Sequence, residues 1–162
     1  MSETKPMVRL SKLWPEQWIF GLRMLLLEML EGGKTVHRLN SYSGQPGCQE
    51  FRRYSDPGSW PGNLEPIPQG WHDLDTTKYA IIERGTEIYN NGIGKWCTPL
   101  YPRSRPIKRD EFLVHMDYNK GNSPGTAGCA AILHPDHEKI WIDWRKKWDR
   151  IPLISFEVQW GL

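Results

Sequence analysis

A histidine and a cysteine are placed in this sequence so that they could form a nucleophilic pair. An apolar run at 112–114 leads to His115 and Asp117, and a loop rich in Gly, Asn, Ser and Pro then leads to Cys129. If one strand ends near His115 and the next begins at Cys129, the loop can fold the two side chains face to face. A thiol near pH 7 is only a few per cent thiolate, so a catalytic cysteine needs a nearby imidazole or another positive environment. His115 is the candidate base for Cys129.

The residues beside the cysteine fit acyl transfer. Gly125 and Gly128 lack side chains, so backbone N–H groups could approach a developing oxyanion there. A structural interpretation stands beside this one, because a cysteine followed by Ala130-Ala131 is often a buried core thiol and a single histidine is often structural. The local pattern leaves both interpretations open.

Three separated motifs carry a resemblance to a known family. The order His115, variable loop, Thr126-Ala127-Gly128-Cys129, apolar run resembles the L,D-transpeptidase (YkuD-like) catalytic domain. It looks most similar to the short branch that includes toxin domains of type VI secretion effectors, whose loop reads much like residues 123–129. Residues 42–44 (Tyr-Ser-Gly) and 66–71 (Pro-Ile-Pro-Gln-Gly-Trp) are similar to that branch as well, and so is the approach to the histidine from Arg109.

The resemblance implies an activity on peptidoglycan stem peptides without a cofactor. Cys129 would attack an amide next to a D- or meso-centre to form a thioester acyl-enzyme. His115 would take the thiol proton and pass one to the leaving amine. Water as acceptor gives hydrolysis and an amine gives cross-linking or exchange. Ala127 stands where many transpeptidases have histidine, and the acceptor stays open.

Further residues of this region are candidates for supporting roles. Asp117 could orient His115 or contact the substrate amine. Arg109 could hold a substrate carboxylate by a bidentate contact or form only a surface salt bridge. Thr126 could donate a hydrogen bond near the oxyanion or shape the turn. Ser123 and Gly128 complete the predicted site.

Composition limits the other possibilities. The 162 residues include 21 basic and 19 acidic side chains, for a net charge of +2, which is too balanced to favour a nucleic-acid partner. Cys48 and Cys97 could form a disulfide or stay reduced with Cys129. The spacing of Cys and His does not fit a metal site.

The N-terminal third predicts a helix. Pro15 and Glu16 are typical of a helix start, Gly32-Gly33 of a helix end, and residues 18–30 (Trp18 to Leu30) are apolar on nearly every face. The run is too short for a transmembrane segment and contains Arg23. We therefore expect residues 1–33 to form a tail and an added helix that packs across a sheet or binds a carrier, virion or oligomer partner.

Residues 34–162 predict a mainly β catalytic domain, an L,D-transpeptidase-like sandwich. Alternation and turn residues predict short strands at 36–40, 71–75, 78–83, 95–100 and 153–160. The proline-rich segment 48–70 predicts a long ordered loop that partly walls the substrate groove. Pro135 predicts the start of a short helix after the cysteine, running to Trp148.

The first residues show no signal peptide. The protein is therefore expected to be made in the cytoplasm and to act at the cell wall in the periplasm after export, injection or lysis, or as part of a virion. This favours a phage or effector protein that degrades the wall. The alternative is a non-catalytic wall-binding or structural component of a phage particle or tail.

Overall fold

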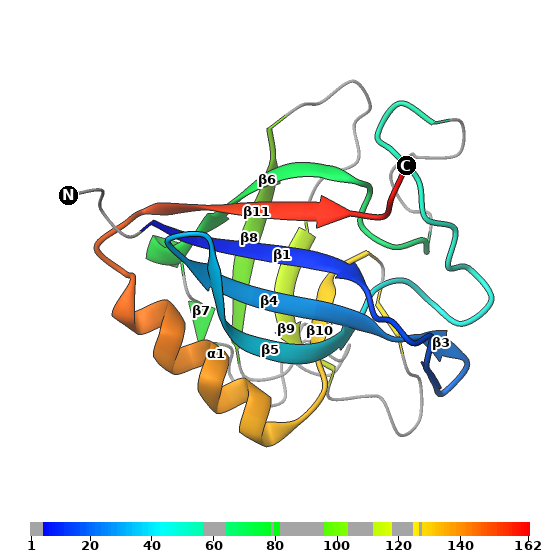
Figure 1. Ribbon diagram of the computed structural model, residues 1–162, viewed down its shortest axis with the longest axis horizontal. Coiled ribbons are helices and arrows are strands. Elements are labelled where there is room, and N and C mark those ends of the chain that lie inside the picture. Colours follow the sequence, from blue (N-terminus) through cyan, green and yellow to red (C-terminus); the bar gives the residue numbers. More distant parts are fainter. Residues whose placement is uncertain are drawn as a thin grey trace.

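A closed barrel of eight strands is the centre of the computed structural model (Figure 1). The structure describes residues 5–56, 64–78, 80–81, 96–103, 112–117, 125–126 and 128–162. In chain order its elements are β1 (Pro6–Lys12), β2 (Trp18–Ile19), β3 (Leu22–Arg23), β4 (Leu25–Glu31), β5 (Lys34–Tyr42), β6 (Gly70–Asp75), the 3₁₀ helix η1 (Thr76–Lys78), β7 (Ala80–Ile81), β8 (Trp96–Pro102), β9 (Phe112–Met116), β10 (Ala130–Ile132), α1 (Pro135–Lys147) and β11 (Leu153–Gln159).

The strand order explains how the barrel closes. The main sheet runs β6-β11-β1-β4-β5-β10-β9-β8-β7, and β6 also pairs with β8. This last pairing joins the two ends of the sheet, so β6 and β8 have no open edge there. The prediction of a mainly β protein agrees with the 48% strand content, but the predicted sandwich is wrong, because the strands form a closed barrel.

The predicted N-terminal helix is also wrong. Residues 18–30 form β2, β3 and most of β4, and both β1 and β4 are barrel strands. In β4, Leu25, Leu27 and Met29 are buried in the core, with the less buried Leu26 and Glu28 between them. A register shift after Met29 then buries Leu30 as well. A strand that is covered on part of both faces is nearly continuously apolar, which a sequence pattern cannot distinguish from a buried helix.

The glycine pair that was expected to end this helix is a hairpin turn instead. Gly32 and Gly33 connect β4 to β5, and both have positive φ, of 59° and 79°. Two consecutive positive φ values suit the tight two-residue turn between antiparallel strands, and glycine adopts them without steric cost.

Other elements agree with their predictions. The strands expected at 36–40 and 71–75 lie within β5 and β6, and the last strand is β11. The strand expected at 95–100 corresponds to β8, which runs from Trp96 to Pro102. The helix predicted to start at Pro135 is α1, with the proline in its first turn. Of the strand expected at 78–83, residues 80–81 are described as β7.

Alternating side chains fill the barrel interior. Strand residues at every second position form one core, including Val8 and Leu10 from β1, Phe156 from β11 and Val114 from β9. Fully burying a side chain of this size contributes roughly 1.5–3 kcal/mol to stability. Burial of these interior side chains is therefore the main source of stability. Residues on the outer face can carry other chemistry without disturbing this core.

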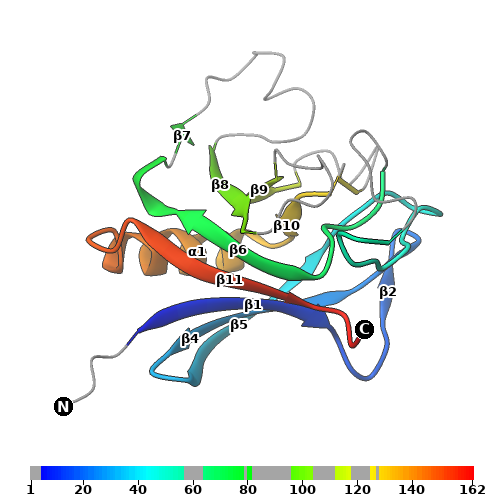
Figure 2. The ribbon, with the colours of Figure 1, turned by 90° about the horizontal axis from the view of Figure 1, so that it is seen from above.

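Helix α1 closes one end of the barrel, which we call the helix end (Figures 1 and 2). Trp141, Trp144 and Trp148 join the barrel core. The Trp96 indole N–H donates to Glu138 Oε2 at 2.8 Å, and Trp144 donates to Glu31 Oε2 at 3.2 Å. These bonds tie α1 to the start of β8 and the end of β4.

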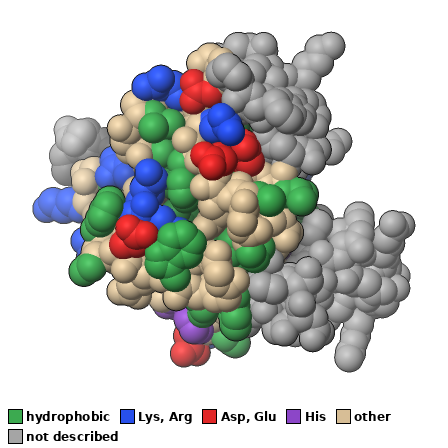
Figure 3. Space-filling view, turned by 90° about the vertical axis from the view of Figure 1, so that its right-hand side faces the viewer, with side chains coloured by type: hydrophobic (Ala, Val, Ile, Leu, Met, Phe, Trp, Pro, Cys, Tyr) green, Lys and Arg blue, Asp and Glu red, His purple; other side chains and the backbone are tan. Residues whose placement is uncertain are grey.

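The opposite end, which we call the loop end, is covered by the long segment between β5 and β6. Within its described parts, 43–56 and 64–69, Phe51 packs edge-on against Trp160 at 4.8 Å between ring centroids. The Trp160 indole N–H donates to the Ile67 carbonyl at 3.0 Å. Figure 3 shows this side of the molecule, where charges of both signs are interspersed with hydrophobic side chains over the described surface. The ordered loop predicted at 48–70 is therefore observed at 48–56 and 64–69, the parts of it that the structure describes.

Candidate active site

Strands β9 and β10 bring the chain segments of the candidate base and nucleophile next to each other. They run parallel, with Ala131 opposite His115, and Tyr42 of β5 is opposite Ala131 on the other side. Val114 and Ala130 belong to the barrel core, so His115 and Ala131 lie on the outer face by strand alternation. Cys129 directly precedes β10, two residues before the strand partner of His115.

The ring of His115 is oriented by the backbone. Its Nδ1 lies 2.5 Å from the Met116 carbonyl oxygen. A carbonyl oxygen only accepts hydrogen bonds, so Nδ1 carries the proton and Nε2 has the lone pair of a base. His115 is 5% exposed. Burial lowers its pKa below the usual value, and this effect outweighs the opposing effects of the Met116 bond and the Asp117 charge. The imidazole is therefore neutral near pH 7.

Asp117 contacts the loop before the cysteine. Its Oδ2 accepts a hydrogen bond from the Tyr42 hydroxyl and another from the Gly125 backbone N–H at 2.9 Å. Burial, and then the bond and charge of Asp117, raise the pKa of Tyr42, so this hydroxyl stays a donor. Both contacts make Asp117 an anchor between β5, β9 and the loop before Cys129. Its expected role in orienting His115 stays a prediction.

Thr126 joins the cysteine to the turn after β5. Its hydroxyl donates to the Cys129 carbonyl at 2.7 Å and accepts from the Gly44 N–H at 3.1 Å. The Gly128 N–H also points to this hydroxyl, at 3.3 Å, and the Thr126 N–H donates to the Gly44 carbonyl at 2.8 Å. Two roles were considered for Thr126, and these contacts correspond to the shaping of the turn.

Two glycines are required where this loop meets the turn. Gly125 has φ +110°, and a Cβ there would lie 2.7 Å from the Gly44 carbonyl oxygen. Gly44 has φ +86°, and a Cβ there would lie 2.9 Å from two atoms of Pro66. Any other residue at either position would be strained and would also push the backbones apart.

Ser43 brings the third motif to the same place. Its hydroxyl donates to the Gly128 carbonyl at 3.1 Å and accepts from the Ile67 N–H at 3.0 Å. Residues 42–44, Ile67 and the described residues 125–126 and 128–129 are therefore joined at the loop end. The sequence indicated these motifs, but the linking roles of Tyr42 and Ser43 were not predicted, because side-chain partners so far apart leave no signal in the local pattern.

Two predicted site residues and the three cysteines remain. Arg109 and Ser123 lie outside the described residues. Cys48, Cys97 and Cys129 are all thiols, so Cys48 and Cys97 are not bridged. Among the described residues no cluster of His, Cys, Asp and Glu suits a metal ion, and no helix is long and apolar enough to cross a membrane.

Comparisons with known protein families and with curated proteins find no match to this chain. The functional assignment therefore depends on the motifs and on the geometry around Cys129.

Proposed function

We propose that this protein is a cysteine-dependent enzyme of L,D-transpeptidase type that acts on peptidoglycan stem peptides as a hydrolase or transpeptidase. The observation that carries the proposal is the contact of three motifs around Cys129, linked by the Ser43 hydroxyl to Gly128 and Ile67. Ser43 and Gly128, which this link joins, are separated by 85 residues along the chain.

The state of His115 supports a specific order of proton transfers. Since the imidazole is neutral, the Cys129 thiol would lose its proton to His115 Nε2 as sulfur attacks the amide carbon. The Met116 carbonyl would stabilise the imidazolium formed. The imidazolium would then protonate the leaving amine as the C–N bond breaks, which leaves a thioester on Cys129. Water or an acceptor amine would release the acyl group and restore the thiol.

One observation favours a second candidate. His115 is buried, so the access of a substrate to its Nε2 is narrow. A phage particle or tail component that binds wall without cutting it would tolerate this burial.

Both candidates keep the expected site of action at the cell wall in the periplasm, after export, injection or lysis, or within a virion. The helix expected to dock on a carrier does not exist, and any such contact would involve β2 to β4.

Purified wall fragments separate the two candidates. Wild type, Cys129→Ala and the matched thiol control Cys48→Ala are incubated with fragments, and the products are read by mass spectrometry. Loss of stem-peptide residues, opened cross-links or exchange of a terminal D-residue by wild type and Cys48→Ala alone supports the enzyme, and the product mass identifies the reaction. Binding without any change by all three proteins would replace the enzyme with the wall-binding component.

A further inference from the structure

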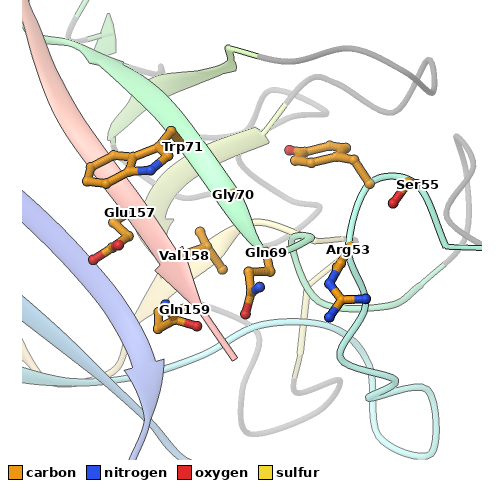
Figure 4. Close-up of a pocket in the computed structure, with 9 residues that line it drawn as sticks. Arg53, Ser55, Gln69, Gly70, Trp71, Glu157, Val158 and Gln159 are labelled. Atoms are coloured by element: carbon orange, nitrogen blue, oxygen red, sulfur yellow. The ribbon is translucent and has the colours of Figure 1, made fainter. Parts of the chain in front are cut away.

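A pocket of about 430 Å³ lies at the loop end, where β6 begins and β11 ends (Figure 4). In the strand order, β6 and β11 are separated from β10 by β1, β4 and β5 in one direction and by β8 and β9 in the other. The pocket is thus on a different side of the barrel from Cys129. Its volume is in the range of roughly 300–1,000 Å³ that is typical of ligand sites.

An exposed tryptophan forms one wall of this pocket. Trp71 is 44% exposed, although it belongs to a barrel strand. The Arg103 N–H donates to the Trp71 carbonyl at 3.0 Å, and the Arg103 guanidinium lies 5.7 Å from the indole centroid. Arg103 is itself paired with Asp73 at 2.8 Å. The indole is therefore held in place while much of its surface stays in water.

Polar groups surround the indole. Glu157 is the strand partner of Trp71, and its Oε1 accepts from Arg9 Nε at 2.8 Å, which fixes the carboxylate. The Gln159 Oε1 accepts from the Gly161 N–H at 2.9 Å, which leaves its NH₂ group as a donor. Across the pocket, Arg53 adds an exposed guanidinium (Figure 4).

Gly70 and Tyr54 also line the pocket. Gly70 has φ +151°, a conformation that favours glycine, and a Cβ there would lie 3.5 Å from the Tyr54 ring. Glycine at this position therefore adds no side chain to the lining.

We infer that this pocket binds a pyranose ring of an oligosaccharide, with its C–H face on Trp71 and its hydroxyls bonded to Glu157, Gln159 and Arg53. Sugars have this combination of an apolar ring face and many hydroxyls that both donate and accept. Arg9 balances the charge of Glu157, and Arg53 adds one cation on the other wall. The pocket therefore has no strong excess of positive or negative charge that would favour a charged ligand. The site would hold a glycan chain independently of the chemistry at Cys129.

Calorimetric titration with a β-1,4-linked N-acetylglucosamine tetrasaccharide tests this inference. Cys129→Ala serves as the background, so a failure of the proposed enzyme does not affect the result. Trp71→Ala is expected to weaken binding by about tenfold or more, the size of one lost aromatic contact, and Trp71→Phe by less. The matched control is Trp18→Ala on β2, which removes another exposed indole (59% exposed) and should leave binding unchanged.

Three results would overturn the inference: no binding by the background protein, equal binding by Trp71→Ala, or loss of binding in Trp18→Ala instead. A stem tetrapeptide without sugar should not compete, and competition by it would assign the pocket to peptide. If Trp71→Ala does not fold by circular dichroism, the exposed pair Arg53→Ala/Gln159→Ala decides, with a several-fold weakening expected.

Discussion

Two buried histidines with different surroundings show what distinguishes a candidate catalytic residue here. His72 lies inside the barrel, completely buried, with its Nε2 2.6 Å from the Tyr54 hydroxyl and the rings of Phe112 and Phe156 nearby. Burial lowers its pKa to about 4. His115 is almost as buried and its pKa is lowered for the same reason, but it lies on the outer face.

The difference is in what each ring nitrogen faces. The Nδ1 of His115 is bonded to a backbone carbonyl, which leaves Nε2 with the lone pair of a base on a strand next to the one that Cys129 precedes. The Nε2 of His72 is bonded to a hydroxyl of the same core. A lowered pKa therefore reports burial in both cases, and what distinguishes the proposed base is the ring nitrogen left without a core partner.

The largest effect should separate the two histidines by activity. His115→Gln is expected to lower turnover on wall fragments by about 10²- to 10⁴-fold, because the thiol loses its base. The matched variant His72→Gln should keep the turnover of wild type per folded molecule. Turnover is measured at pH 7 by mass spectrometry, with the folded fraction from circular dichroism. Equal losses in both variants would mean that His115 acts only through the fold.

The next effect is the stability of the protein in acid. A histidine in the unfolded chain binds a proton near pH 6.5, whereas folded His72 stays neutral until about pH 4. The unfolded state thus binds more protons in this window, and stability falls as the pH falls. The shift corresponds to about 3 kcal/mol between pH 6.5 and 4. Folded His115, with its lowered pKa, acts in the same direction.

Urea unfolding at pH 7, 6, 5 and 4 measures this loss. His72→Gln should make the decrease shallower by the part that His72 contributes, because glutamine does not titrate, and the part due to His115 should remain. A decrease in His72→Gln as steep as in wild type would show that other groups cause the acid sensitivity.

The sequence predicted strands better than their arrangement. Alternation was enough for β6 and β11, since each has one face in the core and one outside, and for β5, where the exposed residues 36–38 lead into a buried second half. It failed for residues 18–30, where turns at Gly21 and Gly32 break the run into hairpins and both faces of β4 are partly covered. Barrel closure depends on the pairing of β6 with β8, and no local pattern encodes such a pairing.

The motif named the candidate site residues, and their catalytic roles stay predictions. The structure bonds the Thr126 hydroxyl to the Cys129 carbonyl and the Gly128 N–H, and it pairs β9, which carries His115, with β10. The contacts of Asp117 with Tyr42 and Gly125 were not predictable, because they need the fold of three segments. His72 and Tyr54 gave no signal either, since their pairing exists only inside the closed barrel.

Two hydroxyls offer a smaller and matched test. Tyr42→Phe removes a donor to Asp117 and should cost about 1–3 kcal/mol of stability, because a buried carboxylate loses a hydrogen bond. It should also lower turnover, since Asp117 holds Gly125 of the loop before the proposed nucleophile. Tyr54→Phe removes the partner of His72 and should affect stability alone. Unfolding and turnover are measured for both variants. A fall in turnover per folded molecule for Tyr54→Phe would end the distinction between the two regions.

The smallest effect is in the reactivity of the three thiols. Burial raises the pKa of Cys97, so its thiolate is scarce and its alkylation slow. Cys129 is half-buried and, with His115 as its proposed base, should react with iodoacetamide fastest, and half-buried Cys48 serves as the internal reference. His115→Gln should slow Cys129 several-fold without changing Cys48, and His72→Gln should change neither. Rates come from mass spectrometry of digested samples over time.

Because His115 is neutral, its influence comes from accepting the thiol proton and not from a positive charge, so the slowing should be modest. A slowing of a hundredfold or more would instead indicate a standing thiolate–imidazolium pair and a different order of proton transfers.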